Sequence, residues 1–164
     1  MSKIKVADFY YGAVFLMLFQ NGMNPVIVEG DEDRQIYDLT TDNGGCRLYI
    51  KYRADKQNTK TKDYSSWNFT FTDGEINELK SYIQEYNLSM ALVCGVEGLS
   101  ESEIAVLDKK QIEEILKLNK SSISISRKKN ERAYRIPVGG SRENAIKVKS
   151  NRFEDLFLKH TCFS

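Results

Sequence analysis

Residues 88–96, LSMALVCGV, restrict the fold more than any other segment, because nine consecutive positions carry no charged side chain. A continuous apolar run of this length is typical of a β-strand that is covered on both faces. Such a strand needs a layer of secondary structure on each side of its sheet. We therefore expect an α/β protein in which helices pack on a central sheet.

Two segments have the pattern of a capped helix. Thr72 is followed three residues later by Glu75, and Asp108 by Gln111, which is the spacing of a capping box. Apolar residues then recur on one helical face after the first box, and the second box opens the run KKQIEEILKL, residues 109–118. Both helices are expected to cover the sheet with their apolar faces.

The most apolar stretch is YYGAVFLMLF, residues 10–19. It lies between Asp8, a candidate cap, and Gly22, a candidate stop, so we interpret it as a buried N-terminal helix. The stretch is too short to span a bilayer, and neither a basic segment nor a small-residue cleavage site accompanies it. We expect a cytoplasmic protein that makes no contact with the membrane.

Short alternating runs predict the strands. NPVIVEGD (24–31), RQIYDLTT (34–41) and CRLYIKYRA (46–54) read as three strands, and the pair Asn43-Gly44 predicts a hairpin between the second and third. WNFTFT also alternates, and we interpret its aromatic residues as the inward face of a core strand rather than as a base-stacking platform. The remaining extended segments are EIAVL, SISIS and RAYRIPV, the last two forming a basic hairpin.

The resulting order is α-β-β-β-(β)-α-β-β-α-β-β, which predicts an α+β arrangement with a mixed sheet flanked by helices. At 164 residues the chain fits a single domain. We expect a core over residues 5–118 and a basic hairpin with a tail over 120–164. The polar stretch 55–66 is expected to be a loop, and the Gly-Gly segment 137–147 a plain loop rather than an anion-binding one.

The content of cysteine and histidine excludes several chemistries. Cys46, Cys94 and Cys162 are odd in number and widely spaced, so they form neither a disulfide framework nor a metal knuckle. Cys94 lies in an apolar run and reads as a small buried residue. His160 is the only histidine, which leaves little to build a catalytic triad or a histidine-based zinc site.

Charge is distributed unevenly along the chain. Residues 120–152 contain ten Lys or Arg against Glu131 and Glu143, a net charge of +8, so the rest of the chain carries −7 of the total of +1. This asymmetry indicates a phosphate-facing patch for DNA or RNA, although a solvated hairpin or a surface matching an acidic protein partner would look the same. The candidate nucleic-acid-binding residues are Arg53, Arg127, Lys128, Lys129, Arg132 and Arg135.

A second candidate site lies in the segment RLYIKYRA. On a strand, Arg47, Tyr49, Lys51 and Arg53 share one face, because side chains two residues apart point to the same side. Asp38 precedes Lys51 by 13 residues in the neighbouring predicted strand. The arrangement suits a metal site, a phosphate contact or a solvated face with long apolar stems.

The element order, with IYD ending at Asp38 and YIK ending at Lys51, resembles the core of the restriction-endonuclease-like superfamily of PD-(D/E)xK phosphodiesterases. The resemblance implies that Asp38 is the first metal-binding acid, that Lys51 positions or activates the attacking water, and that Mg²⁺ is the cofactor. The chain departs from the family pattern, since Tyr49 replaces the second acid and Tyr37 the proline.

A single carboxylate beside a neutral phenol would hold Mg²⁺ weakly. Migrated acids that would complete the site are Glu29, which is the best placed, and Asp31, Asp33 or Asp42. With Glu29 the metal ligands would be Asp38 and Glu29, and the catalytic set would add Lys51. The resemblance therefore implies a nucleic-acid-associated protein, either a metal-dependent nuclease or a relative with a degenerate site. The alternative is a non-enzymatic interaction module, such as an inhibitor, immunity or regulatory protein.

Overall fold

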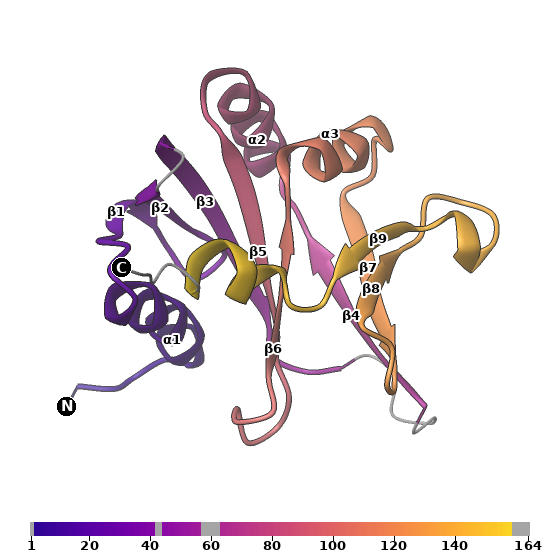
Figure 1. The fold of residues 1–164 in the computed structure, drawn as a ribbon, viewed down its shortest axis with the longest axis horizontal. Coiled ribbons are helices and arrows are strands. Elements are labelled where there is room, and N and C mark those ends of the chain that lie inside the picture. Colours follow the sequence, from indigo (N-terminus) through magenta and orange to yellow (C-terminus); the bar gives the residue numbers. More distant parts are fainter. Residues whose placement is uncertain (1, 42–43, 57–62, 159–164) are drawn as a thin grey trace.

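Two β-sheets and three α-helices form the framework of the protein in the computed structural model, which describes residues 2–41, 44–56 and 63–158 (Figure 1). The mixed α/β class expected from the sequence is confirmed. The elements in chain order are α1 (Val6–Gln20), β1 (Val26–Gly30), β2 (Gln35–Thr41), β3 (Gly44–Arg53), β4 (Tyr64–Thr70), α2 (Asp73–Glu85), β5 (Leu88–Cys94), β6 (Glu103–Leu107), α3 (Lys109–Lys117), β7 (Ser122–Lys128), β8 (Ala133–Ile136), the 3₁₀ turn η1 (Arg142–Asn144), β9 (Ile146–Lys149) and the π-helical turn η2 (Glu154–Leu158).

The first sheet has the strand order β1-β2-β3-β5-β6. Its strands pair antiparallel except β3 and β5, which are parallel and joined through β4 and α2. All seven residues of β5 are buried, which confirms the expectation that this strand is covered on both faces. The sheet is therefore mixed, and β3 and β5 lie at its centre.

Different elements cover the two faces of this sheet, and they bury different side chains of the same strands. Leu48 and Ile50 of β3 pack with α1 and η2, while Tyr49 packs on the opposite face with α2, α3 and the second sheet. Figure 1 shows α1 on one side of the long central strands and the second sheet on the other. Because the side chains of β3 alternate between its two faces, this strand contributes to two separate hydrophobic cores.

The second sheet has the order β4-β7-β8-β9, and all its pairings are antiparallel. The predicted basic hairpin is therefore the middle of a four-stranded sheet, flanked by a strand from the predicted core region and by β9, which we did not predict. Its inner face contributes Trp67, Ile125 and Tyr134 to the shared core. Trp67 is fully buried and donates a hydrogen bond from Nε1 to the carbonyl of Gly95 at 2.7 Å, so the interpretation of a core strand is confirmed.

Of the three helix caps predicted from the sequence, two are confirmed and one is wrong. Both capping boxes form, because the side chains of Thr72 and Asp108 accept hydrogen bonds from the backbone N–H groups three residues later. The prediction of Asp8 as the cap of α1 is wrong: the helix starts at Val6, and the Asp8 carboxylate accepts from the N–H of Lys5, which is the N-cap. Because Asp8 lies within the first turn, it stabilises the positive end of the helix dipole from inside.

Two further expectations need correction. The helix α1 is buried along one face only, and large apolar side chains such as Phe9 and Phe19 are half exposed. The polar stretch 55–66 ends earlier than expected, because Tyr64 already pairs with Lys128 in the second sheet. Its central residues 57–62, Asn43 of the predicted Asn-Gly turn, and His160 and Cys162 in the tail lie outside the described residues, while Gly44 of that turn is the first residue of β3.

Candidate functional site

The side chains of β2 and β3 point to the faces that alternation in the sequence predicts. Ile36 and Tyr49 enter the core shared with the second sheet, so Asp38, Arg47 and Lys51 lie on that same face by alternation. The middle of this face is not open to solvent. The side chains of Arg47 and Lys51 are buried beneath α2, and Asp38, Arg47 and Lys51 each have a partner of opposite charge.

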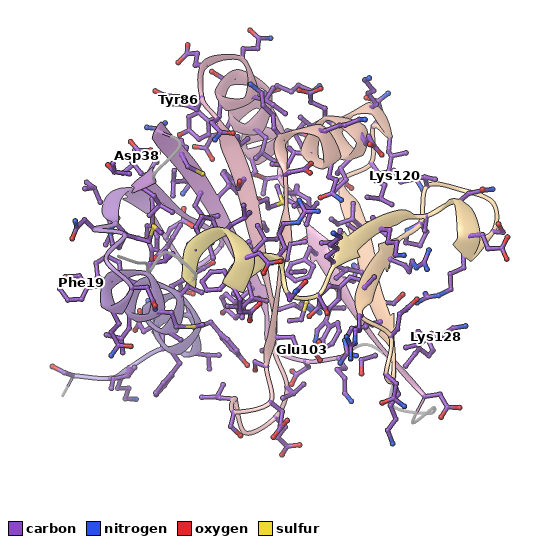
Figure 2. All side chains as sticks on the ribbon, in the orientation of Figure 1. Phe19, Asp38, Tyr86, Glu103, Lys120 and Lys128 are labelled. Atoms are coloured by element: carbon purple, nitrogen blue, oxygen red, sulfur yellow. The ribbon has the colours of Figure 1, made fainter. Side chains whose placement is uncertain are left out.

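Asp38 forms an ion pair with Arg47, its direct cross-strand neighbour. Arg47 donates from Nε and Nη2 to the two carboxylate oxygens of Asp38, at 2.8 and 2.9 Å. The guanidinium also lies over the rings of Tyr82 and Tyr86, 4.7 and 3.8 Å from their centroids. Figure 2 shows Asp38 and Tyr86 close to one end of the first sheet. The oxygens predicted to bind metal are therefore occupied by an arginine held in a cation–π stack.

Lys51 forms a different ion pair, with α2. Its Nζ lies 2.7 Å from Oε2 of Glu75, and both side chains are only 7% exposed. The ammonium also lies 5.0 Å from the centroid of Phe71. The other oxygen of Glu75 accepts the N–H of Thr72 at 2.8 Å, so one carboxylate both caps the helix and neutralises the lysine. This arrangement fixes the start of α2 against β3.

Glu29 belongs to a third cluster, centred on Arg34. Arg34 is buried and contacts Glu29 at 3.1 Å, Asp31 at 2.8 Å and both oxygens of Glu78 at 3.0 and 2.9 Å. Tyr49 donates its hydroxyl to Glu78 at 2.9 Å. Burial, and then the hydrogen bond to Glu78, raises the pKa of Tyr49 well above its usual range, so the phenol remains a neutral donor.

The pKa of Glu78 implies a pH dependence of stability. Burial alone would raise this pKa, but hydrogen bonds from Arg34 and Tyr49 outweigh it and hold the pKa below its ordinary value. The unfolded state then binds more protons than the folded state in this range, so the contribution of Glu78 is fully present at neutral pH and is lost as the pH falls through the folded-state pKa.

We therefore expect Glu78→Gln to be less stable than the native protein at pH 7, with the difference shrinking as the pH falls below the ordinary range of a glutamate. Urea unfolding at pH 7 and pH 4 measures this difference. A stability gap that stays constant between the two pH values would contradict the assigned role of Glu78.

The three residues of the predicted catalytic set are not brought together. Asp38 is paired with Arg47, whereas Lys51 lies four residues further along β3, about 13 Å away at the rise of a strand. The reason is the register: Gln35, the first residue of β2, pairs with Ile50, so Lys51 lies beyond the start of β2.

Among the described residues, no three His, Cys, Asp or Glu side chains are placed to hold a metal ion. The donor set does not fit Mg²⁺, because the oxygens of Asp38 and Glu29 serve separate arginines. Asp42, one of the alternative acids, lies outside the described residues.

The predicted nucleic-acid-binding residues fall into three groups. Arg127 turns inward, where its Nε and Nη2 contact Glu103 of β6 at 2.7 and 2.9 Å. Arg53 is exposed at the end of β3, in the other sheet. The others belong to the second sheet: Lys128, Lys129 and Arg132 are exposed around the β7–β8 turn, and Arg135 lies on the outer face of β8.

We call the side of the second sheet that faces away from the shared core the outer face. Its residues alternate with the buried ones, so it is rich in hydroxyl, amide and basic side chains. Lys128, Lys147 and Lys149 are exposed on it. The residues of the outer face are Tyr64, Ser66, Asn68, Thr70, Ser122, Ser124, Ser126, Lys128, Ala133, Arg135, Lys147 and Lys149.

Short polar contacts order this face. Arg142 of η1 donates to the hydroxyl of Ser126 at 2.9 Å and to Glu131 at 2.6 Å. Glu131 also accepts from Arg135 at 3.3 Å. Ser124 donates to the side-chain oxygen of Asn68 at 3.3 Å. One carboxylate therefore serves two arginines, and the exposed lysines add further positive charge.

Lys147 and Lys149 are missing from the sequence-based list of binding residues, although a signal for them exists. The segment IKVK alternates strictly between apolar and basic residues, which is the period of a half-buried strand. The roles of Glu75 and Glu78 had no comparable signal, because only the tertiary contact of α2 with β3 reveals them.

Comparison with protein-family models, with curated proteins and with solved structures finds no match to this chain. Within the described part of the chain, no helix has the length and apolar character needed to cross a membrane.

Proposed function

We propose that the protein binds double-stranded nucleic acid through the outer face of its second sheet, and that its restriction-endonuclease-like core is a scaffold with a degenerate catalytic site. The observation that carries this proposal is the convergence of basic side chains from three strands on one polar sheet face. The ion pairs of Asp38, Lys51 and Glu29 support the degenerate site, because they use the groups that hydrolysis would need.

The charge of the outer face supports contact with phosphates. Lys147 and Lys149 lie two residues apart on β9, about 7 Å at the rise of a strand, and Arg135 pairs across from Lys147 on β8. Lysine and arginine at such spacing gain affinity by releasing counterions from the nucleic-acid backbone. Serine and asparagine side chains on the neighbouring strands β4 and β7 supply further donors to phosphate oxygens.

The distribution of aromatic residues supports a duplex rather than a single strand. Proteins that bind single strands stack bases on exposed aromatic rings. In the described part of the second sheet, Trp67, Phe69 and Tyr134 all face the core and are buried, and Tyr64, at the end of β4, is the one outward-facing aromatic residue. Contact with the backbone alone predicts binding that depends strongly on salt and little on sequence.

Fluorescence anisotropy with labelled 16-base-pair DNA and RNA duplexes and the corresponding single strands tests this proposal. Duplexes are expected to bind more tightly than single strands, with log K falling linearly against log salt between 50 and 200 mM. A gel of the same samples with Mg²⁺ is expected to show no cleavage. A preference for single strands, affinity that does not change with salt, or no binding at 50 mM salt would contradict the proposal.

A second candidate function is that of a protein-interaction module, which is favoured by exposed apolar side chains at the other end of the molecule. Val26, Ile27 and Val28 on the edge strand β1 are 43–63% exposed, and Phe19 on α1 is 58% exposed. Figure 2 shows Phe19 far from Lys128. Exposed apolar patches mark interaction sites. A protein partner that Phe19→Asp loses, while binding of nucleic acid is unchanged, would support this function.

A further inference from the structure

A cavity of about 490 Å³ lies between α1, β6 and the second sheet. Phe9, Ala13 and Met17 line one wall from α1, because residues four apart share a helix face. Ile104 of β6 and Leu99 of the preceding loop line another. The volume falls in the range of about 300–1,000 Å³ that is usual for small-molecule sites.

The mouth of the cavity holds large apolar side chains in exposed positions. Phe9 is 50% exposed and Leu99 is 40% exposed. Leu99 adopts a φ of 69°, in the left-handed region that a leucine rarely occupies. Hydrogen bonds from its N–H to Val96 and from Ser102 to its carbonyl, both 3.0 Å, maintain this turn. This turn fixes the apolar side chain of Leu99 at the edge of the cavity.

The polar part of the lining is already paired in a way that disfavours an anion. Arg127 donates to both oxygens of Glu103 and, from Nη1, to the carbonyls of Lys128 and Glu131 at 3.3 and 3.1 Å. Tyr134 donates its hydroxyl to Glu103 at 2.7 Å. The guanidinium therefore has little donor capacity left for a ligand.

Both oxygens of Glu103 already accept from Arg127 and Tyr134, whereas Glu154 has no hydrogen-bond or ion-pair partner in the described part of the chain. The lining contains two carboxylates, Glu103 and Glu154, against the one guanidinium of Arg127. Figure 2 shows Glu103 between α1 and the second sheet. A ligand that buries an apolar body against α1 would thus meet one unpaired carboxylate, that of Glu154, in the lining.

We propose that this cavity binds a small amphiphile with an apolar body and a protonated amine as its head group. The apolar body would lie against Phe9, Met17 and Ile104, and the amine would donate to the carboxylate of Glu154. The site shares no outer-face residue with the proposed nucleic-acid surface, so either proposal stands if the other fails.

Binding of the neutral dye Nile red tests the cavity, with decylamine and decanoic acid as competitors of equal chain length. The native protein is expected to enhance Nile red fluorescence at a single saturable site. Decylamine is expected to displace the dye at a concentration at least 10-fold below that of decanoic acid. Absence of saturable enhancement would overturn the site, and equal displacement by the two competitors would overturn the amine head group.

Substitutions on α1 test whether the dye binds in this cavity. Ala13→Trp fills the space between Phe9 and Met17 and is expected to weaken dye binding at least 10-fold, with Ala13→Leu giving a smaller loss in the same direction. Leu16→Trp is the matched control, because Leu16 is exposed on the same helix and does not line the cavity. Equal affinity of the Ala13→Trp and Leu16→Trp proteins, both checked for folding by circular dichroism, would overturn the proposal.

Discussion

Replacing Lys51 by methionine is expected to lower the free energy of unfolding by about 3–5 kcal/mol, the usual cost of removing one partner of a buried ion pair. Glu75 would keep a buried charge with only the N–H of Thr72 as its partner. Methionine preserves the length of the lysine stem, so the loss reports the charge rather than a cavity. Urea unfolding at pH 7, followed by circular dichroism, measures the effect.

The double variant Lys51→Met/Glu75→Gln separates charge from packing. Glutamine at position 75 can still accept from Thr72 and complete the capping box, while the uncompensated charge is gone. Most of the lost stability is therefore expected to return. Lys80→Met, an exposed change on the same helix, is the control and should stay within about 0.5 kcal/mol of the native protein. If the double variant lost as much stability as the sum of the losses in the two single variants, the assignment of a buried Lys51–Glu75 ion pair would be contradicted.

This expectation changes how a catalytic test of Lys51 must be interpreted. In a metal-dependent nuclease the lysine must reach the attacking water, so Lys51→Ala would abolish cleavage in a folded protein. Here the same change removes the counter-ion of a buried carboxylate. Loss of activity on substitution would therefore be evidence of catalysis only if the variant remained folded.

Changing Lys128, Lys147 and Lys149 together to glutamine is expected to weaken duplex binding on the order of 100-fold at 0.15 M salt. Each lost phosphate contact removes about 0.9 from the slope of log K against log salt, so the slope should fall by about 2.7. The three side chains are exposed, and stability should change little. Anisotropy titrations at four salt concentrations measure both quantities.

The control for this variant is glutamine at Lys3, Lys80 and Lys117, three exposed lysines outside the second sheet. Both triple variants change the formal net charge from +1 to −2, since each removes three of the 24 basic residues. The control should retain nearly native affinity and slope. If duplex affinity fell equally in the two triple variants, the duplex would be held by non-specific electrostatic attraction to the whole protein rather than by the outer face.

Local chemistry made much of the fold predictable. The capping boxes at Thr72 and Asp108 depend on contacts three residues apart, and the faces of β3 depend on strict alternation. The buried strand β5 is evident from its lack of charge. Features of this kind need no knowledge of distant segments, which is why they could be read directly from the sequence.

Pairing between distant segments was not predictable in the same way. Asp38 and Lys51 have the separation along the chain that a phosphodiesterase motif requires, but the register places Arg47 opposite Asp38. A shift of strand register changes which side chains meet without altering the local pattern. Likewise β4 pairs with β7, so that Asn68 meets Ser124 across 56 residues of sequence.

The positive charge of the candidate site could be predicted from the sequence, but the positions of its side chains on the sheet could not. The excess of basic residues after position 120 indicated a patch, and Arg135 does lie on the outer face. Arg127 does not, because it is held by Glu103 from the other sheet. Choosing among neighbouring basic residues required knowing to which face of the second sheet each side chain points.

An NMR titration of the ¹⁵N-labelled protein with a 16-base-pair DNA duplex tests the central claim most directly. Amide signals of Ser124, Arg135, Lys147 and Lys149 are expected to shift or broaden with added duplex, while those around Lys51 and Phe19 stay unchanged. Perturbations centred on Lys51 or on α1, with the second sheet unaffected, would contradict the assignment of the outer face as the nucleic-acid surface.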